Sequence, residues 1–118
     1  MRILVVDDQE DGRVLLEKML AARGHQVRFA QSGREALEQV RGKPPDLIIS
    51  DILMPAMNGY ALCRDLKADP ALAHIPFVFY TATFLGPEEE RLALDLGARR
   101  FLRKPFTPED LDGVLEEI

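Results

Sequence analysis

The chain has 118 residues, of which 47% are hydrophobic and 30% charged, with a formal net charge of −5 and a sequence pI of about 5.0. This length suits one domain that buries its own core, and the composition is that of a soluble globular protein. The acidic balance argues against direct binding to DNA or RNA, which requires a basic face. One cysteine excludes an internal disulfide, and no apolar run approaches the roughly 20 residues that span a bilayer. We therefore expect a cytoplasmic protein with no signal peptide and no membrane insertion.

The first half of the chain alternates between strand and helix patterns. Residues 3–6 form an apolar, β-branched run of strand length. Apolar residues at helical spacing predict a helix over 10–23, which a glycine then ends. Residues 27–30 follow as a second strand. The capping-box pattern at 32–35 opens a second helix, closed by Gly42 and two prolines.

The middle of the chain continues this alternation. The third strand is predicted at 47–50, and Asn58-Gly59 marks a turn and a helix start. That helix is expected to end at Asp69-Pro70. A fourth strand follows at 77–80.

The last part of the chain completes five strand and helix pairs. Pro87 is suited to the first position of a helix that runs to Gly97, and a short fifth strand follows at 101–102. Thr107 caps the final helix, which is expected to reach Ile118. Such alternation with short connections predicts a single α/β domain, with a parallel sheet covered by helices on both faces.

Polar groups follow four of the five predicted strands. They are Asp7 and Asp8 after the first strand, Asp51 after the third, Thr81 after the fourth and Lys104 after the fifth. In an open parallel sheet, ligands bind beyond the carboxyl ends of the strands. We therefore expect these side chains to share one edge of the sheet.

This set of groups predicts phosphoryl-transfer chemistry. Three crowded carboxylates repel one another unless a cation lies between them, and Mg²⁺, or Mn²⁺ in its place, suits oxygen ligands and phosphate. Lys104 supplies a compact positive charge, Thr81 supplies a hydroxyl, and Ala82 leaves room for phosphate beside it. Asp51 is then the expected nucleophile, which forms an acyl phosphate.

Four motifs together resemble the CheY-like receiver domains of two-component response regulators, over essentially the whole length. They are Leu4-Val-Val-Asp-Asp8, Ile49-Ser-Asp-Ile-Leu-Met-Pro-Ala-Met-Asn-Gly59, Tyr80-Thr-Ala82 and Lys104-Pro105. The resemblance implies a flavodoxin-like (βα)5 domain over residues 1–118, with strand order 2-1-3-4-5. Such domains are signalling switches that assist their own phosphorylation and dephosphorylation, and are not turnover enzymes.

The resemblance assigns a role to each residue of the predicted site. Asp51 resembles the phosphoacceptor, which receives its phosphoryl group from a histidine kinase's phosphohistidine or a small phosphodonor. Asp7 and Asp8 resemble the acidic pair that holds Mg²⁺ together with Asp51, and the backbone carbonyl of Leu53 is a further ligand. Lys104 resembles the lysine that pairs with the phosphoryl group.

The resemblance also implies a conformational switch and its partners. Thr81 resembles the switch hydroxyl, and Phe101 the aromatic residue that changes rotamer with it. The consequence is expected on the face formed by the helix at 87–97, the strand at 101–102 and the last helix. The implied partners are a histidine kinase or phosphotransfer protein and a downstream effector, and homodimerisation through this face stays open.

The sequence departs from the family pattern at one position of the site. Leu53 is apolar where relatives often carry a polar residue that positions the attacking water, so slow hydrolysis of the phosphoryl group is implied.

Other functional classes remain as alternatives. An aspartate-nucleophile phosphatase would carry a second aspartate two residues after the first, where this chain has Leu53. A phosphorylation-independent pseudo-receiver typically lacks an acid or the lysine, and this chain has them all. A nucleotide-binding flavodoxin-like protein is disfavoured because neither glycine-rich phosphate motif is present. A receiver segment of a hybrid sensor kinase or of a longer regulator stays open.

Overall fold

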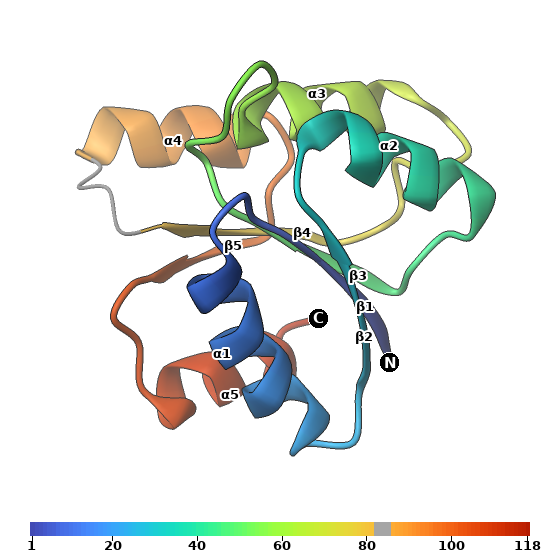
Figure 1. Ribbon diagram of the computed structural model, residues 1–118. Helices are drawn as coiled ribbons and strands as arrows, with labels where there is room; N and C mark the ends of the chain where they lie inside the picture. Colours follow the sequence, from blue (N-terminus) through green and yellow to red (C-terminus); the bar gives the residue numbers. More distant parts are fainter. Residues whose placement is uncertain (82–85) are drawn as a thin grey trace.

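The computed structural model describes residues 1–81 and 86–118. Five parallel strands form one twisted sheet in the order β2-β1-β3-β4-β5 (Figure 1), which confirms the predicted α/β class and strand order. The strands are β1 (Arg2–Val6), β2 (Gln26–Ala30), β3 (Leu47–Ser50), β4 (Phe77–Thr81) and β5 (Arg100–Arg103).

Five helices cover the two faces of the sheet. They are α1 (Glu10–Ala21), α2 (Gly33–Gly42), α3 (Gly59–Ala68), α4 (Pro87–Asp95) and α5 (Pro108–Glu116). Helices α2, α3 and α4 lie on one face, and α1 and α5 lie on the other (Figure 1). This three-layer arrangement leaves the carboxyl ends of the strands, where the predicted site residues follow, at one rim.

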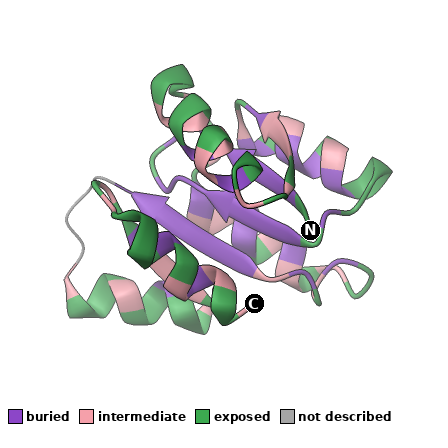
Figure 2. Ribbon diagram, turned by 90° about the horizontal axis from the view of Figure 1, so that it is seen from below, coloured by how far each residue is buried: buried purple, intermediate pink, exposed green. Residues whose placement is uncertain are grey.

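Each strand contributes side chains alternately to two cores, as the period of two in a strand requires. Leu4 and Val6 pack beneath α2, α3 and α4, whereas Ile3 and Val5 pack with α1 and α5. The central strands are almost entirely buried, and the exposed residues lie on the outer sides of the helices and in the loops (Figure 2). Both faces of the sheet are thus covered, which explains the continuous apolar runs of the central strands.

Side-chain caps begin three of the helices as their sequences predict. Ser32 accepts a hydrogen bond from the Glu35 N–H at 3.1 Å, and Asn58 accepts one from the Ala61 N–H at 2.9 Å. Thr107 forms a full capping box at the start of α5. These caps satisfy N–H groups of the first turn, which lack partners within the helix.

Several element boundaries differ from the predictions. Helix α1 ends at Ala21 rather than Arg23, and α4 ends at Asp95 rather than Gly97. Two of the apolar residues in α1 are exposed, Val14 at 37% and Leu15 at 59%, because the helix buries only one stripe against the sheet. Thr81 belongs to β4 itself.

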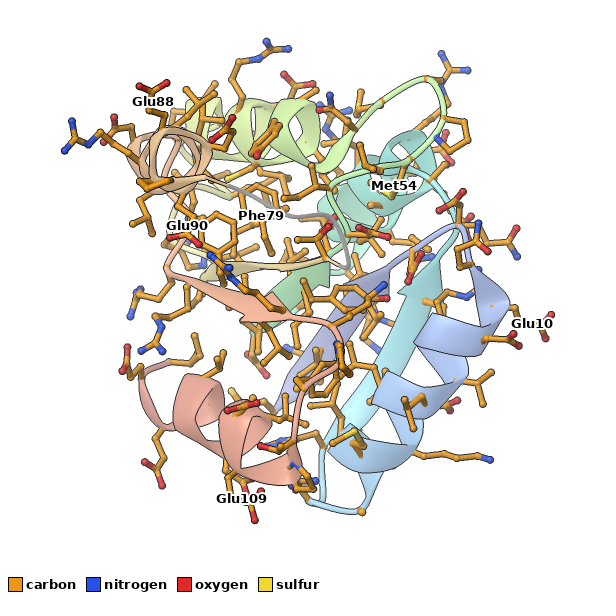
Figure 3. All side chains as sticks on the ribbon, turned by 90° about the vertical axis from the view of Figure 1, so that its left-hand side faces the viewer. Glu10, Met54, Phe79, Glu88, Glu90 and Glu109 are labelled. Atoms are coloured by element: carbon orange, nitrogen blue, oxygen red, sulfur yellow. The ribbon has the colours of Figure 1, made fainter. Side chains whose placement is uncertain are left out.

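The basic residues of β5 lie on an edge strand and pair with acids of the neighbouring helices. Arg103 forms an ion pair with Glu90 of α4, and Arg100 forms one with Glu117 after α5. Figure 3 shows Glu90 on the side of α4 toward β5, whereas Glu88 points away from the sheet. These arginines are thus engaged within the domain. No helix in the described part of the chain has both the length and the apolar character needed to span a membrane.

Candidate functional site

The site lies at the carboxyl ends of β1, β3 and β4, where strand pairing brings together residues distant in sequence. The Asp7 N–H donates to the Ala30 carbonyl at 3.0 Å, and the Asp51 N–H donates to the Val6 carbonyl at 2.9 Å. Both aspartates therefore extend the sheet's hydrogen-bonding pattern just beyond their strands. Lys104 joins them from the loop after β5, where its N–H donates to the Thr81 carbonyl at 2.9 Å.

Lys104 is placed between two buried carboxylates. Its Nζ lies 3.3 Å from Asp7 Oδ2 and 3.6 Å from Asp51 Oδ2. Asp7 is fully buried and Asp51 is 8% exposed. One ammonium group thus faces two carboxylates, so its charge balances only one of them.

Asp51 is oriented by the backbone that follows it. Its Oδ1 accepts a hydrogen bond from the Ile52 N–H at 2.7 Å, which leaves Oδ2 directed toward Lys104. Burial raises the pKa of Asp51 above its ordinary value, Lys104 lowers it, and the charge of Asp7 raises it further. The site therefore favours neutralisation of the negative charge on Asp51, by a proton or by a bound cation.

Three carboxylates meet at a distance suitable for one ion. One oxygen from each of Asp7, Asp8 and Asp51 lies within 4.8 Å of the others. These hard oxygen donors are the ligands that Mg²⁺ prefers, and a cation would offset the crowding that raises the Asp51 pKa. The donor set thus fits the predicted ion.

Two residues of this site escaped the sequence analysis. The Tyr80 hydroxyl donates to Asp7 Oδ2, and Lys104 Nζ lies 4.0 Å from the centre of the Tyr80 ring. Gly12 of α1 packs over the same atoms, since a Cβ there would lie 2.8 Å from Asp7 Oδ2. The alternation of side chains along β4 could have indicated Tyr80, because it places Tyr80 and Val78 on the same side of the sheet, facing α1 and α5. The contact of Gly12 joins residues distant in sequence, so no local sequence pattern indicates it.

A family model for the response regulator receiver domain matches residues 3–116. The chain belongs to this family. This receiver domain is 45% identical over 106 residues to the response regulator PleD of Caulobacter vibrioides. The match covers 89% of this chain and 23% of PleD. It is 40% identical over 104 residues to a gliding motility regulatory protein of Myxococcus xanthus, a match over 88% of this chain and 13% of that protein. The receiver domain thus spans a quarter or less of these two curated relatives.

Solved structures share the fold of this receiver domain over almost its whole length. The chemotaxis protein CheY4 of Vibrio cholerae matches with a TM-score of 0.91 and 32% identity, over 99% of this chain and 97% of that one. The signal receiver domain of a signal transduction histidine kinase from Syntrophus aciditrophicus matches with a TM-score of 0.88 and 37% identity, over 98% and 86% of the two chains. Receiver domains are signalling switches that bind Mg²⁺ at an acidic pocket.

The remaining predicted residues of this receiver domain are placed as follows. Thr81 is buried at the end of β4, and Leu53, after β3, is 60% exposed. Phe101 is half-buried and packs against Phe79, with ring centres 5.6 Å apart. Ala82 lies outside the described residues. The phosphate, metal and switch roles of these residues stay predictions.

Proposed function

We propose that this receiver domain is a phosphoacceptor switch, in which Asp51 takes a phosphoryl group from a histidine kinase, a phosphotransfer protein or a small phosphodonor. The observation that carries the proposal is the position of Asp51 Oδ2, which lies 3.6 Å from Lys104 Nζ and within reach of two further acids. A nucleophile, a cation and metal-binding carboxylates are the parts that phosphoryl transfer to an aspartate requires.

The proposed step is a displacement at phosphorus. Asp51 Oδ2 attacks the phosphorus atom, the P–N bond of the phosphohistidine breaks, and its electron pair leaves with the imidazole nitrogen. The Ile52 N–H holds the other carboxylate oxygen, so the attacking oxygen is fixed in direction. Lys104 then pairs with the transferred phosphoryl group.

Asp7, Asp8, Asp51 and the Leu53 carbonyl would hold Mg²⁺. When bound, this ion neutralises charge on the carboxylates and on the phosphoryl oxygens.

The phosphoryl group is proposed to act through Thr81 and Phe101. The phosphoryl group adds between about −1.5 and −2 charge next to the end of β4. Thr81 moves toward the new oxygens, and Phe101 takes the space that it leaves. The face of α4, β5 and α5 then changes its packing and controls an effector, with homodimerisation through this face as one form of output.

Replacing the proposed nucleophile tests this function. We expect Asp51→Asn to abolish labelling by acetyl phosphate in the presence of Mg²⁺, because an amide does not form the acyl phosphate. Asp95→Asn, at an exposed position of α4, is the matched control and should be labelled like the unaltered chain. Intact-protein mass spectrometry would measure the added phosphoryl mass. Labelling of Asp51→Asn to the same stoichiometry would refute the assignment.

A second arrangement is supported by one of the solved structures. The similarity to the receiver domain of a histidine kinase from Syntrophus aciditrophicus supports a role as the receiver of a hybrid sensor kinase, in which the same chemistry at Asp51 serves a phosphorelay. Finding a kinase core in the same reading frame would support this arrangement.

A further inference from the structure

Tyr80 is a buried tyrosine that borders the acidic site. It is 1% exposed, and its ring lies on the α1 and α5 side of the sheet. The hydroxyl donates to Asp7 Oδ2, and the ring face lies 4.0 Å from Lys104 Nζ. Tyr80 therefore contacts both the first acid of the site and its cation.

The hydrogen bonds of Asp7 leave few free positions on its carboxylate. Oδ1 accepts from the Gln9 N–H at 2.9 Å. Oδ2 accepts from the Tyr80 hydroxyl and also from Lys104 at 3.3 Å. A carboxylate oxygen has about two lone-pair positions, so both positions on Oδ2 are taken, whereas Oδ1 keeps one. A cation that binds Oδ2 must therefore displace one of these donors.

The backbone of α1 encloses this contact. A Cβ at Gly12 would lie 2.8 Å from Asp7 Oδ2 and 3.6 Å from both the Tyr80 hydroxyl and Lys104 Nζ. A side chain at this position would overlap Asp7 Oδ2, so the glycine lets the backbone of α1 pass directly over the three groups. The hydroxyl is buried together with its acceptor, where a hydrogen bond to a charged group is stronger than in water.

We propose that the Tyr80 hydroxyl competes with a divalent cation for Asp7 Oδ2 and so lowers the metal affinity of the Asp7, Asp8 and Asp51 cluster. The proposal rests on the proposed function, because the ion concerned is the one that supports phosphorylation of Asp51. Tyr80 is a positioning residue, since it acts through Asp7. Its hydroxyl also keeps the buried carboxylate paired when Lys104 turns toward a phosphoryl group.

Removing only the hydroxyl tests the competition. Tyr80→Phe keeps the ring beneath Lys104 and frees one position on Asp7 Oδ2. We expect it to bind Mn²⁺ more tightly by roughly three- to tenfold, because hydrogen bonds to charged acceptors are among the stronger ones. The free Mn²⁺ signal in electron paramagnetic resonance titrations measures this affinity directly, and competition with Mg²⁺ extends it to that ion.

The chain offers a matched control in its other tyrosine. Tyr60→Phe removes a hydroxyl in the opposite core, where its ring packs edge-on against Phe79. We expect its Mn²⁺ affinity to equal that of the unaltered chain. Equal or weaker binding by Tyr80→Phe, or an equal gain in Tyr60→Phe, would overturn the proposal.

The same titrations separate this inference from the proposed function. If the unaltered chain binds Mn²⁺ and is labelled on Asp51 but Tyr80→Phe binds no more tightly, the inference fails and the function stands. If Asp51 takes no phosphoryl group while Tyr80→Phe still binds Mn²⁺ more tightly, the function fails and the competition at Asp7 stands.

Discussion

At the scale of single residues, the acidic site is built at a cost to stability. Asp7 and Asp51 are buried, and among residues 1–81 and 86–118 Lys104 is the cation within ion-pair distance of both. A buried carboxylate without a full counter-charge destabilises the fold, and burial raises the pKa of Asp51 accordingly. Such local destabilisation is common where a site must bind a charged ligand.

This cost predicts that Asp51→Asn stabilises the metal-free protein at neutral pH. The pKa of Asp51 is higher in the folded state than its ordinary value of 3.8. At a pH between the ordinary and the raised pKa the folded state therefore binds more protons than the unfolded state, and the stability of the fold falls as the pH rises through this range. The asparagine removes this penalty. We expect its free energy of unfolding at pH 7 to be higher, on the order of 1 kcal/mol, the usual size of a single-residue effect.

Urea denaturation in the presence of a chelator measures this difference. The advantage of the asparagine should shrink as pH falls through the raised pKa of Asp51 toward the ordinary value, because the aspartate is then protonated in both states. The exposed control Asp95→Asn measures the effect of the same replacement at the surface. A destabilised Asp51→Asn at pH 7 would contradict the prediction.

At the scale of secondary-structure elements, the connection from β3 to α3 holds the nucleophile in place. Asn58 caps α3, and the Gly59 N–H donates to the Ile52 carbonyl at 2.8 Å. A Cβ at Gly59 would overlap the Asp51 carbonyl oxygen and lie 3.0 Å from the Ile52 Cα. The start of α3 can therefore pack against the end of β3 only because this position lacks a side chain.

This packing predicts opposite effects for two glycine substitutions. Gly59→Ala should lower the free energy of unfolding by about 2 kcal/mol or more, because backbone atoms must move to admit the methyl group. Gly113→Ala, within α5, has nothing within 4 Å of the new Cβ and should raise it by roughly 0.5 to 1 kcal/mol through helix propensity. Urea denaturation of both variants checks the pair, and equal effects of the two would contradict the close contact at Gly59.

The elements themselves were largely predictable from the sequence, whereas their exact packing was not. Asn58 and Thr107 start helices because side-chain caps act locally. Periodicity placed Val14 and Leu15 in a helix, but it could not say which apolar side chains face the sheet. The acids and Lys104 were predicted to share an edge because parallel strands end on the same side, whereas the contact of Tyr80 with Asp7 depends on the register between distant strands.

At the scale of the whole molecule, the site and the proposed output face are joined through β4 and β5. The carbonyl of Thr81 accepts the Lys104 N–H, and Phe101 pairs in register with Phe79 on the neighbouring strand. Phe79 also packs against Tyr60, so these three aromatic rings lie in the core cluster that contains Ala93 of α4. A shift at the end of β4 therefore has a packed route to α4 and to the outer strand β5.

This continuity predicts where phosphorylation changes the protein's dynamics. Labelling of Asp51 should alter amide hydrogen exchange by roughly twofold or more in peptides from residues 87–106, because repacking around Phe101 changes local opening. Peptides from α2, which packs on β1 and β2 in the half of the sheet away from β5, should exchange at unchanged rates. Asp51→Asn treated with the same phosphodonor is the control and should show no difference. Equal changes in α2 and in residues 87–106 would indicate a global loosening rather than a switch directed to one face.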